Sequence, residues 1–201
     1  EAVAQWAGSG ARVCAGRLED PEFLVSATRG VDALYWSTPN SFPPELSMRA
    51  GYRVFAESAG HAIKTNKIAH TVHLSGFAHV DDGGGDQSLF GALADSEAIL
   101  GGAVEALLQA YPQETFGITH LRAGYFFENW MANIGLIKGA GTNGGGFFPE
   151  LSIPMLASRD IGVAAAALLA NPTFNGQRSR ELQGPRNYSA REVSSILGAS
   201  I

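Results

Sequence analysis

The chain has 201 residues, of which 45% are hydrophobic and 16% are charged, and its formal net charge is −5. This length suits one domain with a sizeable core, and the low charged fraction indicates helices with a buried face. The acidic balance argues against nucleic acid or an anionic membrane as a partner, and no apolar run is long enough to cross a bilayer. The single cysteine, Cys14, excludes an intramolecular disulfide and fits a reducing compartment, so we expect a cytoplasmic protein.

Hydrophobic periodicity predicts strands and helices that alternate along the chain. Strands are predicted at residues 11–15, 31–37, 70–76, 117–122 and 181–184. Helical patterns are predicted at residues 20–30, 52–63, 95–108, 129–138, 160–169 and 189–201. This alternation predicts an α/β fold in which a mostly parallel sheet has helices on both faces.

Capping chemistry marks several helix ends. Asp20 precedes a proline and offers a side-chain oxygen to the free amides of a first turn, and Gly30 is the matching stop. Asp95 is the predicted cap of a helix with one clean apolar face. Ser189 and Glu192 have the spacing of a capping box for the last helix.

The stretch at residues 117–130 ends a predicted strand and continues into three aromatic residues, Tyr125, Phe126 and Phe127. In an open α/β sheet, the segment past the carboxyl end of a strand faces the ligand crevice. With Arg122 before them, these rings suit the wall of a site for a flat ligand. The alternative is that the rings belong to the core and that Arg122 is a surface charge.

Residues 121–129, Leu-Arg-Ala-Gly-Tyr-Phe-Phe-Glu-Asn, resemble the LRPgxFxEN signature of the NmrA-like proteins, which are atypical members of the short-chain dehydrogenase/reductase superfamily. This resemblance implies a Rossmann-like, doubly wound fold that binds NAD(P). Further segments that resemble the family's GDLxDP, VDAVFLxTP, LSS, DIG and LxGP elements lie at residues 16–21, 31–39, 74–76, 160–162 and 182–185.

The resemblance implies that the ends of three neighbouring strands, at Thr38, Ser75 and Arg122, converge on one nucleotide-sized cleft. The residues beside the pyrophosphate and ribose path would be Thr38 and Pro39, and those near the nicotinamide ribose Ser75 and Gly76. Near the nicotinamide would lie Ala123, Gly124 and Tyr125, and on the substrate side Phe126 and Asn129.

The adenine end of the cofactor would lie near residues 16–18. There Arg17 stands where the family usually has an aspartate, and its charge favours a phosphate, hence NADP over NAD. The residues that distinguish the two cofactors follow the family's second strand, which has no counterpart before residue 11.

Proteins of this kind begin with a strand, a glycine-rich turn and a helix whose amides hold the pyrophosphate. No such segment precedes residue 11, so we expect an incomplete domain. Residues 1–134 would form a partial NAD(P)-binding Rossmann-like domain, and residues 135–201 a truncated C-terminal portion packed on its substrate side.

Two glycine-rich stretches mimic ligand motifs. Residues 139–144 match G-x-G-x-x-G, but they follow a predicted helix instead of a strand, so we interpret them as a surface loop. Residues 81–86 are rich in aspartate and glycine, but they lack the spacing and the closing glutamate of a calcium loop.

Reductases of the superfamily commonly use a serine at a strand end and a Tyr/Lys pair on the next helix. Ser75 fits the serine, but no Tyr, Lys or Arg lies between Gly76 and Ala110. His79 is the nearby side chain with a suitable pKa for proton transfer, so one interpretation gives it that role. The alternative interpretation is that His79 is a solvated loop residue without a catalytic role. The adjacent Gly101 and Gly102 make room for a ligand or a packed neighbour, or reflect neutral drift.

The remaining histidines show no metal-binding spacing on a shared face, so no metal site is predicted. They are His61, His70, His73 and His120.

Two functions follow from the resemblance. One is an NAD(P)-dependent oxidoreductase that transfers hydride to a small quinone or enone, with protonation by water or His79. The other is a regulator that binds NAD(P) without turnover and reports to a protein partner, which the missing Tyr/Lys pair favours.

Overall fold

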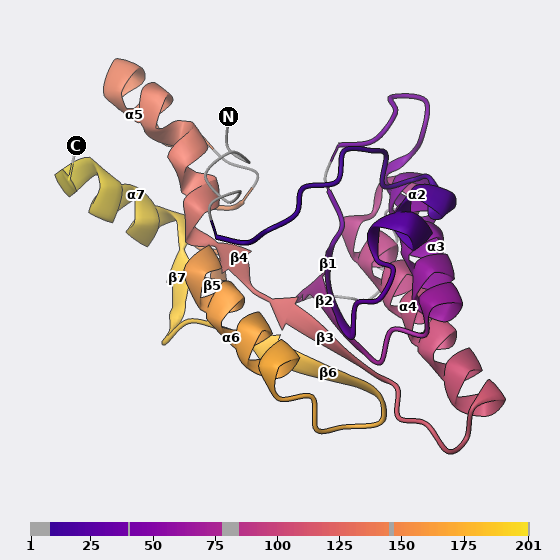
Figure 1. The fold of residues 1–201 in the computed structure, drawn as a ribbon. Coiled ribbons are helices and arrows are strands. Elements are labelled where there is room, and N and C mark those ends of the chain that lie inside the picture. The colour runs from indigo at the N-terminus through magenta and orange to yellow at the C-terminus, as the bar shows by residue number, and fades with distance from the viewer. Residues whose placement is uncertain (1–8, 40, 78–84, 145–146, 201) are drawn as a thin grey trace.

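A four-stranded parallel sheet forms the centre of the computed structural model, which describes residues 9–39, 41–77, 85–144 and 147–200. Its strands lie in the order β1 (Ala33–Ser37), β2 (His70–Gly76), β3 (Gly117–Ala123) and β6 (Gly176–Leu182). A smaller sheet combines β4 (Tyr125–Phe126), β5 (Ser152–Leu156) and β7 (Asn187–Ser189). Because β4 follows β3 after one residue, the two sheets adjoin at Gly124 (Figure 1).

Helices cover both faces of the larger sheet, as Figure 1 shows. On one side, α3 (Met48–Asn66) packs on α4 (Leu89–Ala110), and α2 (Pro21–Ala27) packs on α3. On the other side, α6 (Ser158–Ala170) lies against β1 and β2. The α/β class with a mostly parallel sheet is therefore confirmed. Near the smaller sheet lie η2 (Phe127–Asn133), α5 (Ile134–Ala140) and α7 (Ala190–Ser200), and η1 (Gly85–Gln87) precedes α4.

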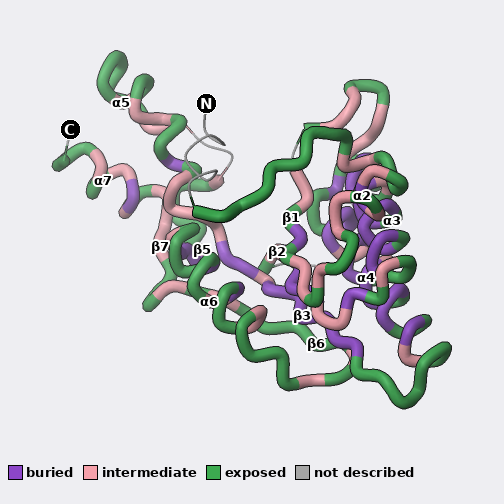
Figure 2. Tube along the Cα trace, in the orientation of Figure 1, coloured by how far each residue is buried: buried purple, intermediate pink, exposed green. Residues whose placement is uncertain are grey.

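The core follows from the two-residue period of the strands, which sends alternate side chains to opposite faces. Toward α3 and α4, Ile118 packs with Leu100, and both are fully buried. Toward α6, Val72 and Leu121 pack with Ala165. Figure 2 shows this burial concentrated in β2, β3 and the helices beside them, while most of α5 and α7 is exposed.

Several local predictions are confirmed. β2 has the predicted bounds, and the predicted apolar stripe falls on the buried side of α3. Asp20 Oδ1 accepts hydrogen bonds from the backbone nitrogens of Glu22 and Phe23, and Ser189 and Glu192 exchange capping bonds at 3.2 and 2.8 Å. α2 ends at Ala27, before Gly30, whose φ of +76° belongs to the turn that follows.

Two predicted strands are corrected. Residues 11–15 form no strand, because in the described chain no neighbour pairs with them, and they are exposed. β6 begins at Gly176, not at residue 181, because its start is set by pairing with Gly117 of β3. The early residues of β6 are polar and exposed, so their pattern does not predict a strand.

The predicted cap of α4 is wrong. The helix begins at Leu89, because the Oγ of Ser88 accepts the backbone N–H of Gly91 at 2.9 Å. Asp95 lies within the helix and accepts hydrogen bonds from Arg49 at 2.7 and 3.0 Å. Asp95 therefore ties α4 to α3.

Candidate functional site

The carboxyl ends of three neighbouring strands lie side by side at one edge of the larger sheet (Figure 1). Ser75 of β2 is the register partner of Arg122 of β3. Thr38 follows Ser37, whose partner in β2 is Leu74. The three strand ends therefore form one row, as the sequence predicted, while their binding roles stay predictions. We call Thr38, Ser75 and Arg122 the strand-end row.

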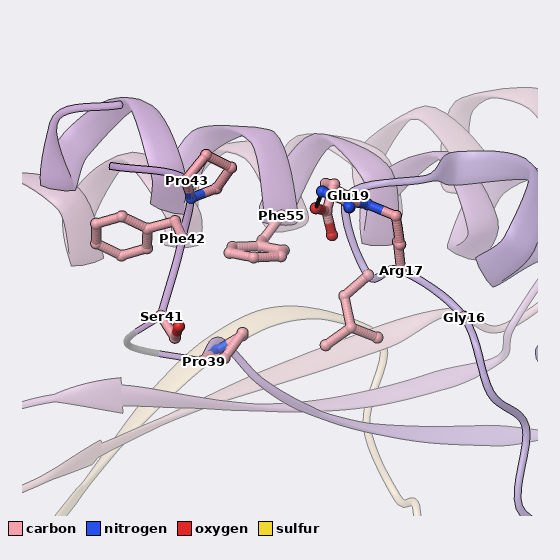
Figure 3. A pocket seen from close by; sticks show the side chains of 9 residues that line it. Gly16, Arg17, Glu19, Pro39, Ser41, Phe42, Pro43 and Phe55 are labelled. Atoms are coloured by element: carbon pink, nitrogen blue, oxygen red, sulfur yellow. Dashed lines mark hydrogen bonds and ion pairs between the residues drawn. The ribbon is translucent and has the colours of Figure 1, made fainter. Parts of the chain in front are cut away.

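A cavity of about 420 Å³ lies beside the β1 end of the strand-end row. Figure 3 shows proline and phenylalanine side chains around it, with Arg17 and Glu19 side by side at one end, where they form an ion pair. Apolar, flat walls with a few polar groups suit a planar heterocycle such as adenine. The apolar lining comes from Leu18, Pro39, Phe42, Pro43 and Phe55, and the polar lining from Arg17, Glu19 and Ser41.

Local contacts hold one wall of this cavity and the neighbouring residue Thr38 in place. A Cβ atom at Gly51 of α3 would lie 2.6 Å from the ring of Phe42, so the glycine makes room for that ring. The indole nitrogen of Trp36 donates a hydrogen bond to the hydroxyl of Thr38 at 3.1 Å. Trp36 is 5% exposed, so the core holds the Thr38 side chain in one orientation.

A largely buried ion pair joins α4 to the end of β3. Arg122 donates from Nε to Glu97 Oε1 at 3.1 Å and from Nη2 to Oε2 at 2.6 Å. The Arg122 side chain is 18% exposed, so it is no surface charge, contrary to the alternative drawn from the sequence. Burial opposes ionisation of Glu97, but hydrogen bonding by Arg122, with Ser75 close by, holds the pKa of this carboxyl below its usual value.

Sequence reasoning missed Glu97. It lies 25 residues from Arg122 in the chain, and only the packing of α4 on the sheet brings the two together. One sequence feature could have indicated the pair: Glu97 is a lone glutamate near the apolar side of a predicted helix, and Arg122 is a charged residue near the end of the next predicted strand.

Two buried histidines meet below the strand-end row. The Nδ1 atoms of His73 and His120 lie 3.0 Å apart. Burial, with His120 adding to it and Glu97 opposing it, lowers the pKa of His73 to about 3, and burial also lowers the pKa of His120. The two histidines meet because they are register partners in β2 and β3, which sequence spacing did not indicate. Within the described residues, no group of three or more side chains could hold a metal ion.

Gly124 has a structural reason to lack a side chain. A Cβ atom there would lie 2.6 Å from the carbonyl oxygen of Pro154 in β5. Its backbone nitrogen donates a hydrogen bond to the carbonyl of Leu182 in β6 at 3.0 Å. Gly124 and the buried Ala123 thus occupy a tight junction between the two sheets.

The three rings after Gly124 do not form one wall. Tyr125 packs edge-on against Trp130 and Phe147, with ring centroids 5.8 and 5.0 Å apart. Phe127 packs against a tyrosine of β7 and belongs to the same cluster as Tyr125, whereas Phe126 joins a different one. Because successive residues of β4 point to opposite sides, Phe126 is separated from the other two rings. All three rings are half-buried against core residues, and their predicted ligand contacts stay predictions.

The remaining residues of the signature have distinct positions. Asn129, predicted on the substrate side, is exposed in η2, while Phe126 is half-buried. Between them, Glu128 accepts hydrogen bonds from the backbone nitrogen and the hydroxyl of Ser158 at 2.9 and 2.7 Å. Glu128 therefore caps α6 and is not aimed at a ligand.

The two adjacent glycines of α4 have different surroundings. A Cβ atom at Gly101 would lie 2.2 Å from Oε1 of Gln177, whose amide nitrogen donates to Glu105 at 2.5 Å. A Cβ atom at Gly102 would meet no atom within 4 Å. Gly101 thus makes room for a packed neighbour, one of the alternatives drawn from the sequence.

The remaining sequence predictions concern loops and the ends of secondary-structure elements. His79 lies outside the described residues, as does most of the acidic loop at 81–86. Pro39 lines the cavity, and Gly76 ends β2. The G-x-G-x-x-G match begins in the last turn of α5, and Gly141 caps that helix with a φ of +63°, so this match is a helix end.

No family model matches the chain. The sequence is 26% identical over 194 residues to the NAD(P)H azoreductase of Xenophilus azovorans, covering 95% of this chain and 59% of that protein. The structure is similar to a nucleoside-diphosphate-sugar epimerase of Staphylococcus aureus, with a TM-score of 0.74, 17% identity, and coverage of 98% of this chain and 62% of the other. It is also similar to an NADPH-dependent quinone oxidoreductase of Escherichia coli complexed with NADPH, with a TM-score of 0.68, 19% identity, and coverage of 99% and 62%.

The fold is Rossmann-like. This Rossmann-like chain spans about three-fifths of the length of the relatives it matches. Among its described helices, none has the length and apolar character that crossing a membrane requires.

Proposed function

We propose that this Rossmann-like chain is NmrA-like, binds NAD(P) along the strand-end row, and serves a reductase that transfers hydride to a small quinone or enone. The observation that carries the proposal is the alignment of Thr38, Ser75 and Arg122 at one sheet edge, with the apolar cavity at its β1 end. Ligands of open α/β sheets bind outside the carboxyl ends of the strands. The similarity to an NAD(P)H azoreductase and to a quinone oxidoreductase complexed with NADPH supports the same reading.

The residues of the row suit successive parts of an extended cofactor. In this proposal the cavity takes the adenine, and residues 1–134 supply most of the dinucleotide site, with residues 135–201 on the substrate side. Bound NAD(P)H supplies the hydride, and the proton comes from water or His79. The cofactor contacts would be Thr38, Pro39, Ser75, Gly76, Ala123, Gly124 and Tyr125, and the substrate contacts Phe126 and Asn129.

Arg17 at the cavity supports NADP as the preferred cofactor. Its guanidinium pairs with Glu19, which offsets part of its charge toward a phosphate. Arg17→Gln should therefore weaken NADPH binding more than NADH binding, and Glu19→Gln should strengthen NADPH binding selectively. Equal effects on both cofactors would reject this assignment.

Titration of NADPH against tryptophan fluorescence tests binding directly. Trp36 contacts Thr38 through a hydrogen bond, so a cofactor at Thr38 should change its emission. Trp36→Phe should remove this part of the signal while calorimetry still reports binding. If neither fluorescence nor calorimetry shows saturable binding of NADPH or NADH, the proposal is rejected.

A second candidate is a regulator that binds NAD(P) without turnover and contacts a protein partner. The observation that favours it is the absence of Tyr, Lys and Arg from Gly76 to Ala110. NADPH oxidation with a panel of quinones and enones separates the candidates, because binding without turnover across the panel favours the regulator. For either function we propose a cytoplasmic location, in keeping with the free Cys14.

A further inference from the structure

Glu97 brings a carboxylate to the strand-end row. Its side chain is 10% exposed, and Arg122 donates one hydrogen bond to each of its oxygens. An ionised carboxylate offers about four acceptor positions in all. Arg122 occupies two of these positions, which leaves acceptor capacity for hydroxyl donors at the end of the sheet where the cofactor is proposed to lie.

Ser75 places a hydroxyl next to this carboxylate. Ser75 is 5% exposed, and its hydroxyl helps to hold the pKa of the Glu97 carboxyl below its usual value. Within the described residues its Oγ atom makes no hydrogen bond of good geometry, so the Ser75 hydroxyl keeps hydrogen-bonding capacity that a ligand can use. Ser75 is also the register partner of Arg122, which puts the three polar groups in one cluster.

The charges of this cluster restrict what it can bind. Glu97 repels an anion, and Arg122 already supplies the cation that the carboxylate requires. The cluster therefore suits a neutral ligand whose hydroxyl groups donate to the Glu97 carboxylate and also accept from the Ser75 hydroxyl. A pair of adjacent hydroxyl groups on a sugar has these properties.

We propose that Glu97, held in place by Arg122 and flanked by Ser75, binds the ribose hydroxyls of the nicotinamide half of the dinucleotide. This inference rests on the proposed function, since it assigns a binding residue within that site. The cavity beside β1 would take the adenosine half, so the two halves depend on different residues.

Two fragments of the cofactor test the assignment by calorimetry. Reduced nicotinamide mononucleotide carries the nicotinamide ribose, and 2′,5′-ADP carries only the adenosine half. Glu97→Gln keeps the shape but removes the charge, and we expect it to weaken binding of the mononucleotide and of NADPH about tenfold or more. Binding of 2′,5′-ADP should be unchanged, and Glu105→Gln, on the exposed side of the same helix, should leave all three affinities unchanged.

The outcomes separate the two levels of the proposal. Mononucleotide binding that is equal in the unaltered protein and in Glu97→Gln overturns the role of Glu97 alone. Equal weakening of both fragments shows that Glu97 only supports the fold, which also overturns it. If the unaltered protein binds neither fragment nor NADPH, the proposed function fails and this inference fails with it. If Glu97→Gln does not fold, the double variant Glu97→Gln/Arg122→Gln removes both buried charges, and the same selective loss is expected.

Discussion

Glu128 caps a helix to which it does not belong. Its carboxylate accepts hydrogen bonds from the backbone nitrogen and the hydroxyl of Ser158, in the first turn of α6. Ala157, at the N-cap position, has no side-chain oxygen to offer the free N–H groups there. Glu128, 30 residues earlier in the chain, supplies the missing acceptor and a favourable charge at the positive end of the helix dipole.

Glu128→Ala should lower the free energy of unfolding by about 1 kcal/mol, the usual effect of losing an N-cap. Urea denaturation of the two proteins measures the difference. Glu45→Ala, at an exposed position outside the helices, is the matched control and should change stability by less than about 0.5 kcal/mol. Equal stability of Glu128→Ala and the unaltered protein would show that α6 needs no cap from Glu128.

The adjacent glycines of α4 should respond to alanine to different degrees. Gly102→Ala meets no atom within 4 Å, so it should stabilise the protein by about 0.5–1 kcal/mol through helix propensity. Gly101→Ala should stabilise it less, because the new methyl group moves the flexible, exposed Gln177 side chain away from its bond to Glu105. Thermal unfolding of both variants checks this, and a second substitution, Gln177→Ala, should remove the difference between the two sites.

Gly124→Ala should be strongly destabilising. The added Cβ would lie 2.6 Å from the carbonyl oxygen of Pro154, and backbone cannot move aside as a flexible side chain can. We expect a loss of about 1–3 kcal/mol, as for other overpacked sites. Gly135→Ala, where a Cβ atom meets nothing within 4 Å, is the control. Chemical denaturation distinguishes this structural role from a purely cofactor-related one, in which Gly124→Ala would keep full stability.

The buried histidine pair should make stability depend on pH. The pKa of His73 falls to about 3 in the folded protein, mainly through burial, against 6.5 for an ordinary histidine. Between these values the unfolded chain binds a proton that the folded chain does not, so stability falls as pH falls from about 6.5 toward 3. His73→Gln should flatten this dependence by up to about 1.4 kcal/mol per pH unit.

Denaturation midpoints measured from pH 7 to pH 4 test this prediction. His61→Gln serves as the control, because the His61 side chain is 47% exposed on α3 and its removal should leave the slope unchanged. An unaltered slope in His73→Gln would show that another group, such as His120 or Glu97 beside it, governs the acid response.

Much of the fold is visible in the sequence because its signals are local. The cap at Asp20, the capping box at Ser189 and the bounds of β2 depend on residues a few positions apart. The helical apolar faces are periodic, so the α/β class follows from them. The errors at residues 11–15 and at the start of β6 arise where strand formation depends on a distant neighbour, which no local pattern reports.

The candidate site also contains features that local sequence signals predict and features that depend on residues far apart in the chain. The sequence by itself determined that Thr38, Ser75 and Arg122 each lie within one residue of the end of a strand. Only the tertiary structure decided that Glu97 faces Arg122, because the rotation of α4 over the sheet selects which helical side chains meet the strand ends. It also decided the meeting of His73 with His120, because the alternating pattern of a strand fixes which face each residue takes but not which residue of the neighbouring strand lies opposite it.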